Sequence, residues 1–362
     1  MREKGKISSM QLMFLIITYN IGTSFIFTVG GEAKEDAWLA ALLGTAISLI
    51  MAMIYLSLAN RFPGQTLVAI NDQVWGGFFG KIFSVVFILY IFIICTLTIN
   101  LTVRFQKELL LETPPLVLAL LGTGITLILI SRGLKVLARC IQLISIINWI
   151  IWVFILLLAI PSFDIVNFQP VFQTPIPLLF TSALRVSAFS FATGFGFLMI
   201  FPRVSDSQKI HISVIKAFAV SGLLLVSTVA FTIGILGSAQ GYFLFPALNA
   251  SRLINVGEIF TRMEVLTGII FWLGGFLVQT IYINILTETM NEFFKLKSAQ
   301  TLIIPLWIVL SLVSVQMFAS SSEDVEFASK VYNWFTVPIQ YVIPLLTMGV
   351  ALVRKPGRED NK

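Results

Sequence analysis

Residues 19–27 read YNIGTSFIF and lie inside an apolar run that begins at Met10 and ends near Val29. A run of about 20 apolar residues spans the hydrocarbon core of a bilayer as an α-helix. The middle of this run nevertheless holds a glycine and three polar residues, namely Asn20, Gly22, Thr23 and Ser24. Glycine weakens a helix, and backbone groups freed from a helix cannot face lipid without a partner. The stretch therefore predicts an interrupted membrane helix whose backbone lines a cavity.

The composition supports a membrane location for the whole chain. Of the 362 residues, 57% are hydrophobic and only 12% are charged, whereas soluble domains carry about 25% charged residues. We therefore expect an all-α polytopic membrane protein in a lipid bilayer, with residues 1–362 forming a single integral membrane domain. The net charge of +6 comes from basic residues scattered over short loops, which favours membrane topology signals over a nucleic-acid partner.

The residues that usually carry catalysis or bind metals are sparse. Cys95 and Cys140 fall in different apolar segments without a metal-ligand neighbour, and the single histidine, His211, lies among charged residues at a segment end. These positions predict no metal site, no cofactor and no enzyme.

Ten apolar segments fit a membrane-spanning pattern. They are residues 9–30, 37–60, 81–103, 114–131, 137–160, 178–202, 212–236, 264–290, 299–319 and 331–353. If the N-terminus is cytoplasmic, the cytoplasmic connections and both termini hold 17 of the 24 Lys and Arg residues, the opposite side holds six, and Arg185 lies inside a segment. This asymmetry predicts that both termini are cytoplasmic.

A second interruption is predicted in the sixth segment, where residues 189–197 read FSFATGFGF. The first and sixth segments begin the two five-helix halves of the chain, about residues 9–160 and 178–353. Paired interrupted helices at matching positions indicate a transporter fold of two inverted repeats with its binding site at the interruptions. The alternative is that Gly, Ser and Thr in these segments simply allow close helix packing.

The expected ligand-binding residues follow from these two interruptions. They are Gly22, Thr23, Ser24, Phe191, Thr193, Gly194 and Phe195. Backbone N–H groups at the helix ends suit a carboxylate, and Phe191 or Phe195 would close over a small ligand. Candidate accessory residues are Asn20, Tyr90, Arg185 and Gln279. For Arg185 two interpretations stay open: it pairs with a ligand or protein carboxylate, or it reaches the outer interface.

Several short motifs recur in an order that resembles a known family. They are Ile21-Gly22-Thr23-Ser24, Lys34-Glu35-Asp36-Ala37-Trp38, Arg104 to Pro114 with Glu112-Thr113-Pro114, Phe163 to Val171 (FDIVNFQPV), Phe201-Pro202 and Gly257 to Glu264 (GEIFTRME). This order resembles the B subunits of bacterial spore germinant receptors, the endospore germination permeases of the amino acid–polyamine–organocation (APC) transporter superfamily.

The resemblance implies an APC/LeuT-like fold with ten helices, a partner A subunit and a partner C subunit. It also implies the inner membrane of a spore and a nutrient ligand such as an amino acid or sugar. The chain departs from the family at Gly196, where members carry an acidic residue, and at Thr261, which replaces a glutamate. The first departure puts recognition of a ligand amino group through the sixth segment in question.

Three functions remain open from the sequence. The first is a nutrient-sensing subunit that triggers germination, and the second is an APC-superfamily amino-acid secondary transporter. The third is a scaffold subunit without a ligand site. The lack of evident carboxylates within the membrane weighs against proton coupling in the second, and the glycines of both interruptions weigh against the third.

Overall fold

The computed structural model describes residues 6–22, 24, 30–109, 112–255 and 262–354. Helices are the regular secondary structure of these ranges, joined by turns and loops, and one isolated parallel β-bridge links Ile7 and Val204. The all-α prediction is therefore confirmed for the described residues.

The long helices follow the apolar segments of the sequence closely. They are α1 (Ser9–Ile21), α2 (Ala37–Arg61), α3 (Leu67–Leu109), α4 (Pro115–Ser131), α5 (Leu134–Ala159), α6 (Ile176–Ser190), α7 (Ile210–Leu236), α9 (Glu264–Phe293), α10 (Gln300–Gln316) and α13 (Ile343–Arg354). Within the described residues, seven helical stretches are long and apolar enough to cross a membrane, and α1, α4 and α10 are shorter apolar helices. The count of ten membrane crossings remains a prediction.

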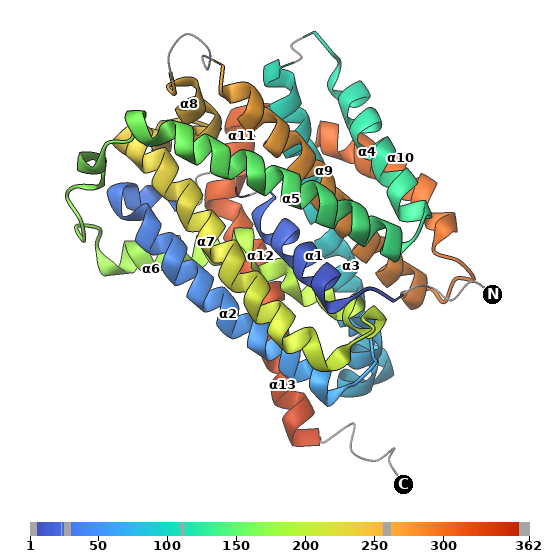
Figure 1. Ribbon diagram of the computed structural model, residues 1–362. Coiled ribbons are helices and arrows are strands. Elements are labelled where there is room, and N and C mark those ends of the chain that lie inside the picture. Colours follow the sequence, from blue (N-terminus) through green and yellow to red (C-terminus); the bar gives the residue numbers. More distant parts are fainter. Residues whose placement is uncertain (1–5, 23, 25–29, 110–111, 256–261, 355–362) are drawn as a thin grey trace.

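The helices pack as one bundle (Figure 1). Helix α1 packs against α5, α7 and α9, while α2 packs against α6 and α7. Helix α3 packs along α9, and α10 packs against α4. Large apolar side chains such as Ile50, Leu121, Leu143 and Ile150 remain exposed on the outer helix faces. Such faces suit contact with lipid rather than water.

Local sequence signals set several helix ends. Helix α1 begins with a capping box, because Ser8 Oγ accepts from the Gln11 N–H at 3.1 Å and the Gln11 side chain accepts from the Ser8 N–H at 2.9 Å. Helix α7 ends at Gly237, whose φ of 57° lies in the left-handed region that favours glycine. Gly76 has φ of 80° and ψ of 171°, so it is non-helical and marks a kink in α3 where two helical stretches meet.

Asp36, one of the two acidic residues of the KEDAW motif, has a structural role. Asp36 is 2% exposed, and its carboxylate accepts hydrogen bonds from the backbone N–H groups of Phe172 at 2.7 Å and Thr174 at 2.9 Å. These bonds fix the loop that precedes α6 against the start of α2. The entry angle of α6 therefore depends on a residue 136 positions earlier in the chain.

The C-terminal third contains irregular helices that the sequence pattern did not predict. A short helix, α8 (Pro246–Arg252), precedes α9. Two π-helical stretches, Phe327–Val331 and Pro338–Val342, flank α12 (Tyr332–Val337), which follows α11 (Ser321–Glu326). Single-turn π segments are frequent at functional sites, and the second one contributes residues to the region described next.

Candidate functional site: the two interrupted helices

Helix α1 ends inside the predicted interruption. Its last residue is Ile21, and a turn follows in which the Ser24 N–H donates to the Ile21 carbonyl at 2.8 Å. Gly22 lies at a close approach between α1 and α9. A Cβ added at Gly22 would lie 3.0 Å from the Gly274 carbonyl oxygen and 2.1 Å from Val278 Cγ2. Glycine is therefore needed at this position for close packing, in line with the packing alternative.

Helix α6 is also interrupted where the sequence predicts. It ends at Ser190, Phe191 has φ of −127° and ψ of −25°, and a 3₁₀ segment, η4 (Ala192–Met199), continues the chain. Within this segment the Gly194 N–H donates to the Phe191 carbonyl at 3.2 Å. The change from α to 3₁₀ geometry frees backbone groups from their α-helical hydrogen bonds and makes the helix narrower here.

The two interruptions meet through serine hydroxyl groups. Ser24 Oγ lies 2.7 Å from Ser190 Oγ, in a hydrogen bond that spans 166 positions of sequence, and both residues are 2% exposed. The glycines themselves face different neighbours, since Gly22 contacts α9 whereas Gly194 contacts Tyr55 and Phe218. A direct glycine-to-glycine contact is therefore not what joins the two helices.

Asn20 is the next-to-last residue of α1, and its side chain reaches the neighbouring helix α7. Its Nδ2 donates to Ser221 Oγ on α7 at 3.1 Å, while its Oδ1 is buried without a hydrogen-bond partner among the described residues. An unpaired buried carbonyl oxygen is costly. It is therefore a candidate acceptor for a ligand donor.

Two predicted phenylalanines pack over the interruption of α6. Phe191 stacks on Phe218 with ring centroids 5.7 Å apart. Phe195 contacts Tyr55 and Phe87, each at a centroid distance of 5.7 Å. Both are buried, and their closing over a small ligand stays a prediction.

A further polar group comes from the second π-helical stretch, which the sequence pattern missed. The Gln340 side chain donates through Nε2 to the Tyr90 hydroxyl, and its backbone carbonyl accepts from the Tyr55 hydroxyl at 2.7 Å. Gln340 Oε1 is buried and has no partner among the described residues. Because Tyr55 also contacts Gly194, this stretch belongs to the same central region. A proline at 338 within an apolar segment was the available sequence signal.

The other candidate residues have different places. Gln279 Nε2 donates to the Thr98 carbonyl on α3 at 3.4 Å, so it contributes to helix packing. Arg185 forms an ion pair with Glu32, and both side chains are partly exposed, at 33% and 42%. This is the pairing with a protein carboxylate that the sequence left open. Thr23 lies outside the described residues, and so does Thr261.

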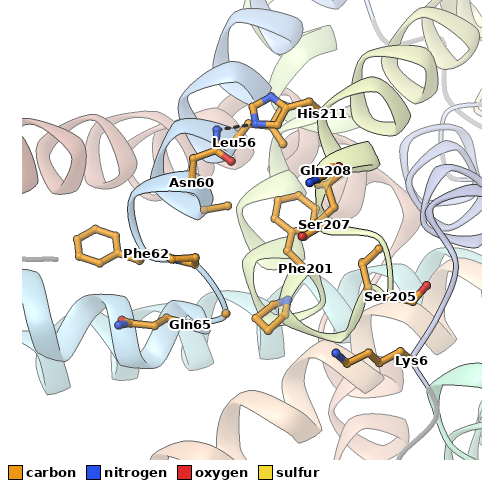
Figure 2. Close-up of a pocket in the computed structure, with 16 residues that line it drawn as sticks. Lys6, Leu56, Asn60, Phe62, Gln65, Phe201, Ser205, Ser207, Gln208 and His211 are labelled. Carbon is orange, nitrogen blue, oxygen red and sulfur yellow. Dashed lines mark hydrogen bonds between the residues drawn. The ribbon is translucent and has the colours of Figure 1, made fainter. Parts of the chain in front are cut away.

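Two cavities lie among the described residues near and below the interruption of α6. The cavity at the interruption holds about 10 Å³ and is lined by Tyr55, Gly194 and Phe197, with other apolar residues. A larger cavity of 460 Å³ opens at the end of the bundle where α7 begins (Figure 2). Phe201 lines both cavities, so one aromatic ring stands between them. In the part of the chain that the structure describes, no cluster of His, Cys, Asp and Glu could hold a metal ion.

Comparison with known proteins assigns a family to this architecture. The model of the family described as spore germination protein matches residues 6–322. The chain belongs to this spore germination protein family. Its apolar helices and its family together identify an integral membrane protein of the permease type that is related to germination.

Individual relatives agree with this family over nearly the full length. Spore germination protein KB of Bacillus subtilis is 29% identical, with 99% of this chain and 98% of the relative covered. Spore germination protein YndE of the same organism is 24% identical, with 98% and 99% covered. Their full-length coverage matches the long span of sequence over which the motifs resembled this family.

The fold is shared with a transporter of known structure. Mhp1, a nucleobase-cation-symport-1 family transporter in a closed conformation with bromovinylhydantoin bound, matches with a TM-score of 0.67 at 17% identity. The match covers 97% of this chain and 80% of that chain. At this identity the likeness concerns the fold alone.

Proposed function

We propose that this protein is the membrane subunit of a spore germinant receptor. It binds a small nutrient between the two interrupted helices and thereby triggers germination. The observation that carries the proposal is the Ser24–Ser190 hydrogen bond, which brings the interruptions of α1 and α6 together in a member of a spore germination family.

The polar groups around the interruptions suit a small zwitterion or a sugar. Backbone N–H groups at a helix interruption favour a carboxylate or hydroxyl oxygen. Asn20 Oδ1 and Gln340 Oε1 are unpaired buried acceptors, so they can receive an ammonium or hydroxyl donor. Gly196 replaces the acidic residue that would recognise a ligand amino group. The two amide oxygens would take over the recognition of that amino group.

The cavity of about 10 Å³ beside the interruption of α6 holds no more than about one water molecule, so a nutrient bound there would require it to widen. A ligand changes this equilibrium only by binding one state better than the other. In the proposed arrangement, residues 9–160 and 178–353 form two inverted five-helix repeats with ten membrane crossings within a single domain. Both termini are cytoplasmic, the membrane is the inner membrane of the spore, and A and C subunits convert the change into germination.

An amino-acid secondary transporter is the second candidate, and the fold shared with a symporter favours it. Deletion of the gene in its native spore-former separates the two. A sensor predicts loss of germination with one class of nutrient and unchanged vegetative uptake. A vegetative uptake defect with normal germination would instead establish the transporter.

The proposed site has its own test in the complemented deletion strain. Ser24→Ala and Ser190→Ala should raise the nutrient concentration for half-maximal germination by about two- to tenfold, the net value of one hydrogen bond. Ser57→Ala is the matched control, because its hydroxyl bonds only within its own helix, to the Met53 carbonyl at 2.8 Å. Equal responses of all three variants would show that the joined interruptions do not form the nutrient site.

A further inference from the structure

The 460 Å³ cavity at the start of α7 is separated from the small cavity beside the interruption of α6 by Phe201 and has a distinct chemistry. Three segments surround it: the residues before α1, the loop between α2 and α3, and the loop between η5 (Phe201–Arg203) and α7. Its volume falls in the range of about 300–1,000 Å³ that is typical of small-molecule sites. Its polar lining residues are Lys6, Asn60, Gln65, Ser205, Ser207, Gln208 and His211.

This lining provides a cation and neutral donors, and its lining residues include no carboxylate. Figure 2 shows Lys6 at the lower side of the cavity and His211 at the upper side, with Ser207 and Gln208 between them. The nearby carboxylate of Asp206 is not part of the lining and pairs with Lys209 at 2.8 Å. The lining therefore favours a negatively charged occupant.

Lys6 is held at the cavity by its backbone neighbour. The Ile7 N–H donates to the Arg203 carbonyl at 3.0 Å, and the Ser205 N–H donates to the Ile7 carbonyl at 2.9 Å. Ile7 is fully buried, and the capping box of Ser8 fixes the next residue. The backbone beside Lys6 is thus fixed by the fold, which keeps this exposed side chain at the edge of the cavity.

The nearby Arg203 has a separate partner. Its guanidinium makes a bidentate ion pair with Glu288 on α9, at 2.8 and 2.5 Å. Since Arg203 does not line the cavity, its charge is committed to holding the loop against α9. Among the described residues, the basic side chains that line the cavity are therefore Lys6 and the imidazole of His211.

We propose that this cavity binds a small oxyanion, a carboxylate or phosphate group, through Lys6 and the hydroxyl and amide donors of Ser207 and Gln208. The apolar surface of Leu56, Phe62 and Phe201 would contact the carbon portion of an organic anion. The site is independent of the nutrient proposed at the helix interruptions. It lies at the end of the bundle that we propose to be cytoplasmic, so a cytosolic metabolite and a lipid headgroup are the two sources of this chemistry.

The test is direct binding to the full-length protein, with inorganic phosphate and succinate as the probes. Calorimetry in a neutral detergent at constant ionic strength should give saturable binding of at least one of them. Lys6→Gln should weaken this binding about tenfold, because a charge-assisted hydrogen bond is lost, and Lys6→Arg should retain it. Lys209→Gln is the matched control, because it removes a lysine of the same surface that does not line the cavity.

Nanodiscs distinguish the two sources of the anion. Succinate binding that persists in phosphatidylglycerol nanodiscs identifies a soluble anion. Binding that is lost there, but present in phosphatidylcholine nanodiscs, identifies the lipid headgroup as the occupant of the same oxyanion site. The proposal is overturned if neither probe binds saturably and phosphatidylglycerol retention does not depend on Lys6. It is also overturned if Lys209→Gln weakens binding as much as Lys6→Gln.

Discussion

Replacing Gly22 by alanine tests the close approach of α1 and α9 at the first interruption. The added Cβ would lie 2.1 Å from Val278 Cγ2, 2.9 Å from the Thr18 carbonyl oxygen and 3.0 Å from the Gly274 carbonyl oxygen. A valine side chain can rotate away and the Thr18 carbonyl belongs to α1 itself, but the Gly274 carbonyl oxygen belongs to the backbone of the facing helix α9. The helices must therefore separate, and overpacking of this kind costs about 1–3 kcal/mol.

Gly274→Ala is the matched control, because it places the same methyl group on the other side of the same contact. Its Cβ would lie 3.6 Å from the Gly22 carbonyl oxygen and 3.7 Å from Gly22 Cα, which is ordinary van der Waals contact. Alanine also favours helix over glycine by up to about 1 kcal/mol. Gly274→Ala is therefore expected to preserve or slightly raise stability.

Thermal unfolding in detergent with a thiol-reactive fluorescent dye measures the difference. Cys95 is fully buried and reports unfolding, and Cys140 is replaced by serine in every variant to remove the more accessible thiol. With about 2 °C of midpoint shift per kcal/mol for a large chain, Gly22→Ala should lower the midpoint by about 2–6 °C. Equal midpoints for the two variants, or a larger loss for Gly274→Ala, would refute the packing argument.

Two further predictions concern orientation and pH. In a cysteine-free background, a cysteine at Ser162 should react with an impermeant thiol reagent from outside the cell, whereas one at Lys297 should react only after permeabilisation; the reverse pattern would overturn the proposed topology. Burial raises the pKa of the Asp324 carboxyl, and Arg104, whose Nε lies 3.3 Å from Oδ2, offsets only part of this rise. The protonated form is therefore favoured in the fold, so its stabilising contribution is present at low pH and is lost as pH rises through the raised pKa. Acidification from about pH 7 to about pH 4, near the pKa of an unfolded carboxyl group, should raise the unfolding midpoint of the wild type relative to that of Asp324→Asn. A midpoint difference that stays constant with pH would contradict burial as the cause of the raised pKa.

The fold was largely predictable because lipid imposes simple rules on sequence. The segment predicted at 264–290 corresponds to α9 at Glu264–Phe293, and that predicted at 137–160 corresponds to α5 at Leu134–Ala159. Errors arose where a helix continues beyond its apolar part, as in α3, which extends back to Leu67 through the kink at Gly76. Hydrophobicity locates the membrane-embedded part of a helix but not its polar extension.

The central site was predictable only in part. Glycine and serine in an apolar run indicated both interruptions, and the structure brings Ser24 to Ser190. Gln340 was missed, because a π-helical turn places its side chain toward Tyr90 and α-helical periodicity does not describe that turn. Asp324 gave no signal in the sequence pattern, yet it is 8% exposed and pairs with Arg104 from a distant helix. Such pairings between distant segments cannot be read from one sequence.

The backbone bridge at Ile7 makes the start of α1 and the segment after η5 a single mechanical unit. Pulling the N-terminal segment away from the loop at Arg203 and Ser205 would break two backbone hydrogen bonds, and each exposed partner group in a buried setting costs about 1–3 kcal/mol. This free-energy cost must be met before the two segments separate. Small movements of one interrupted helix are therefore passed on to the other. For protein engineering, a fluorescent or affinity tag joined directly before Lys6 would load this bridge, whereas a tag after α13 would leave it undisturbed.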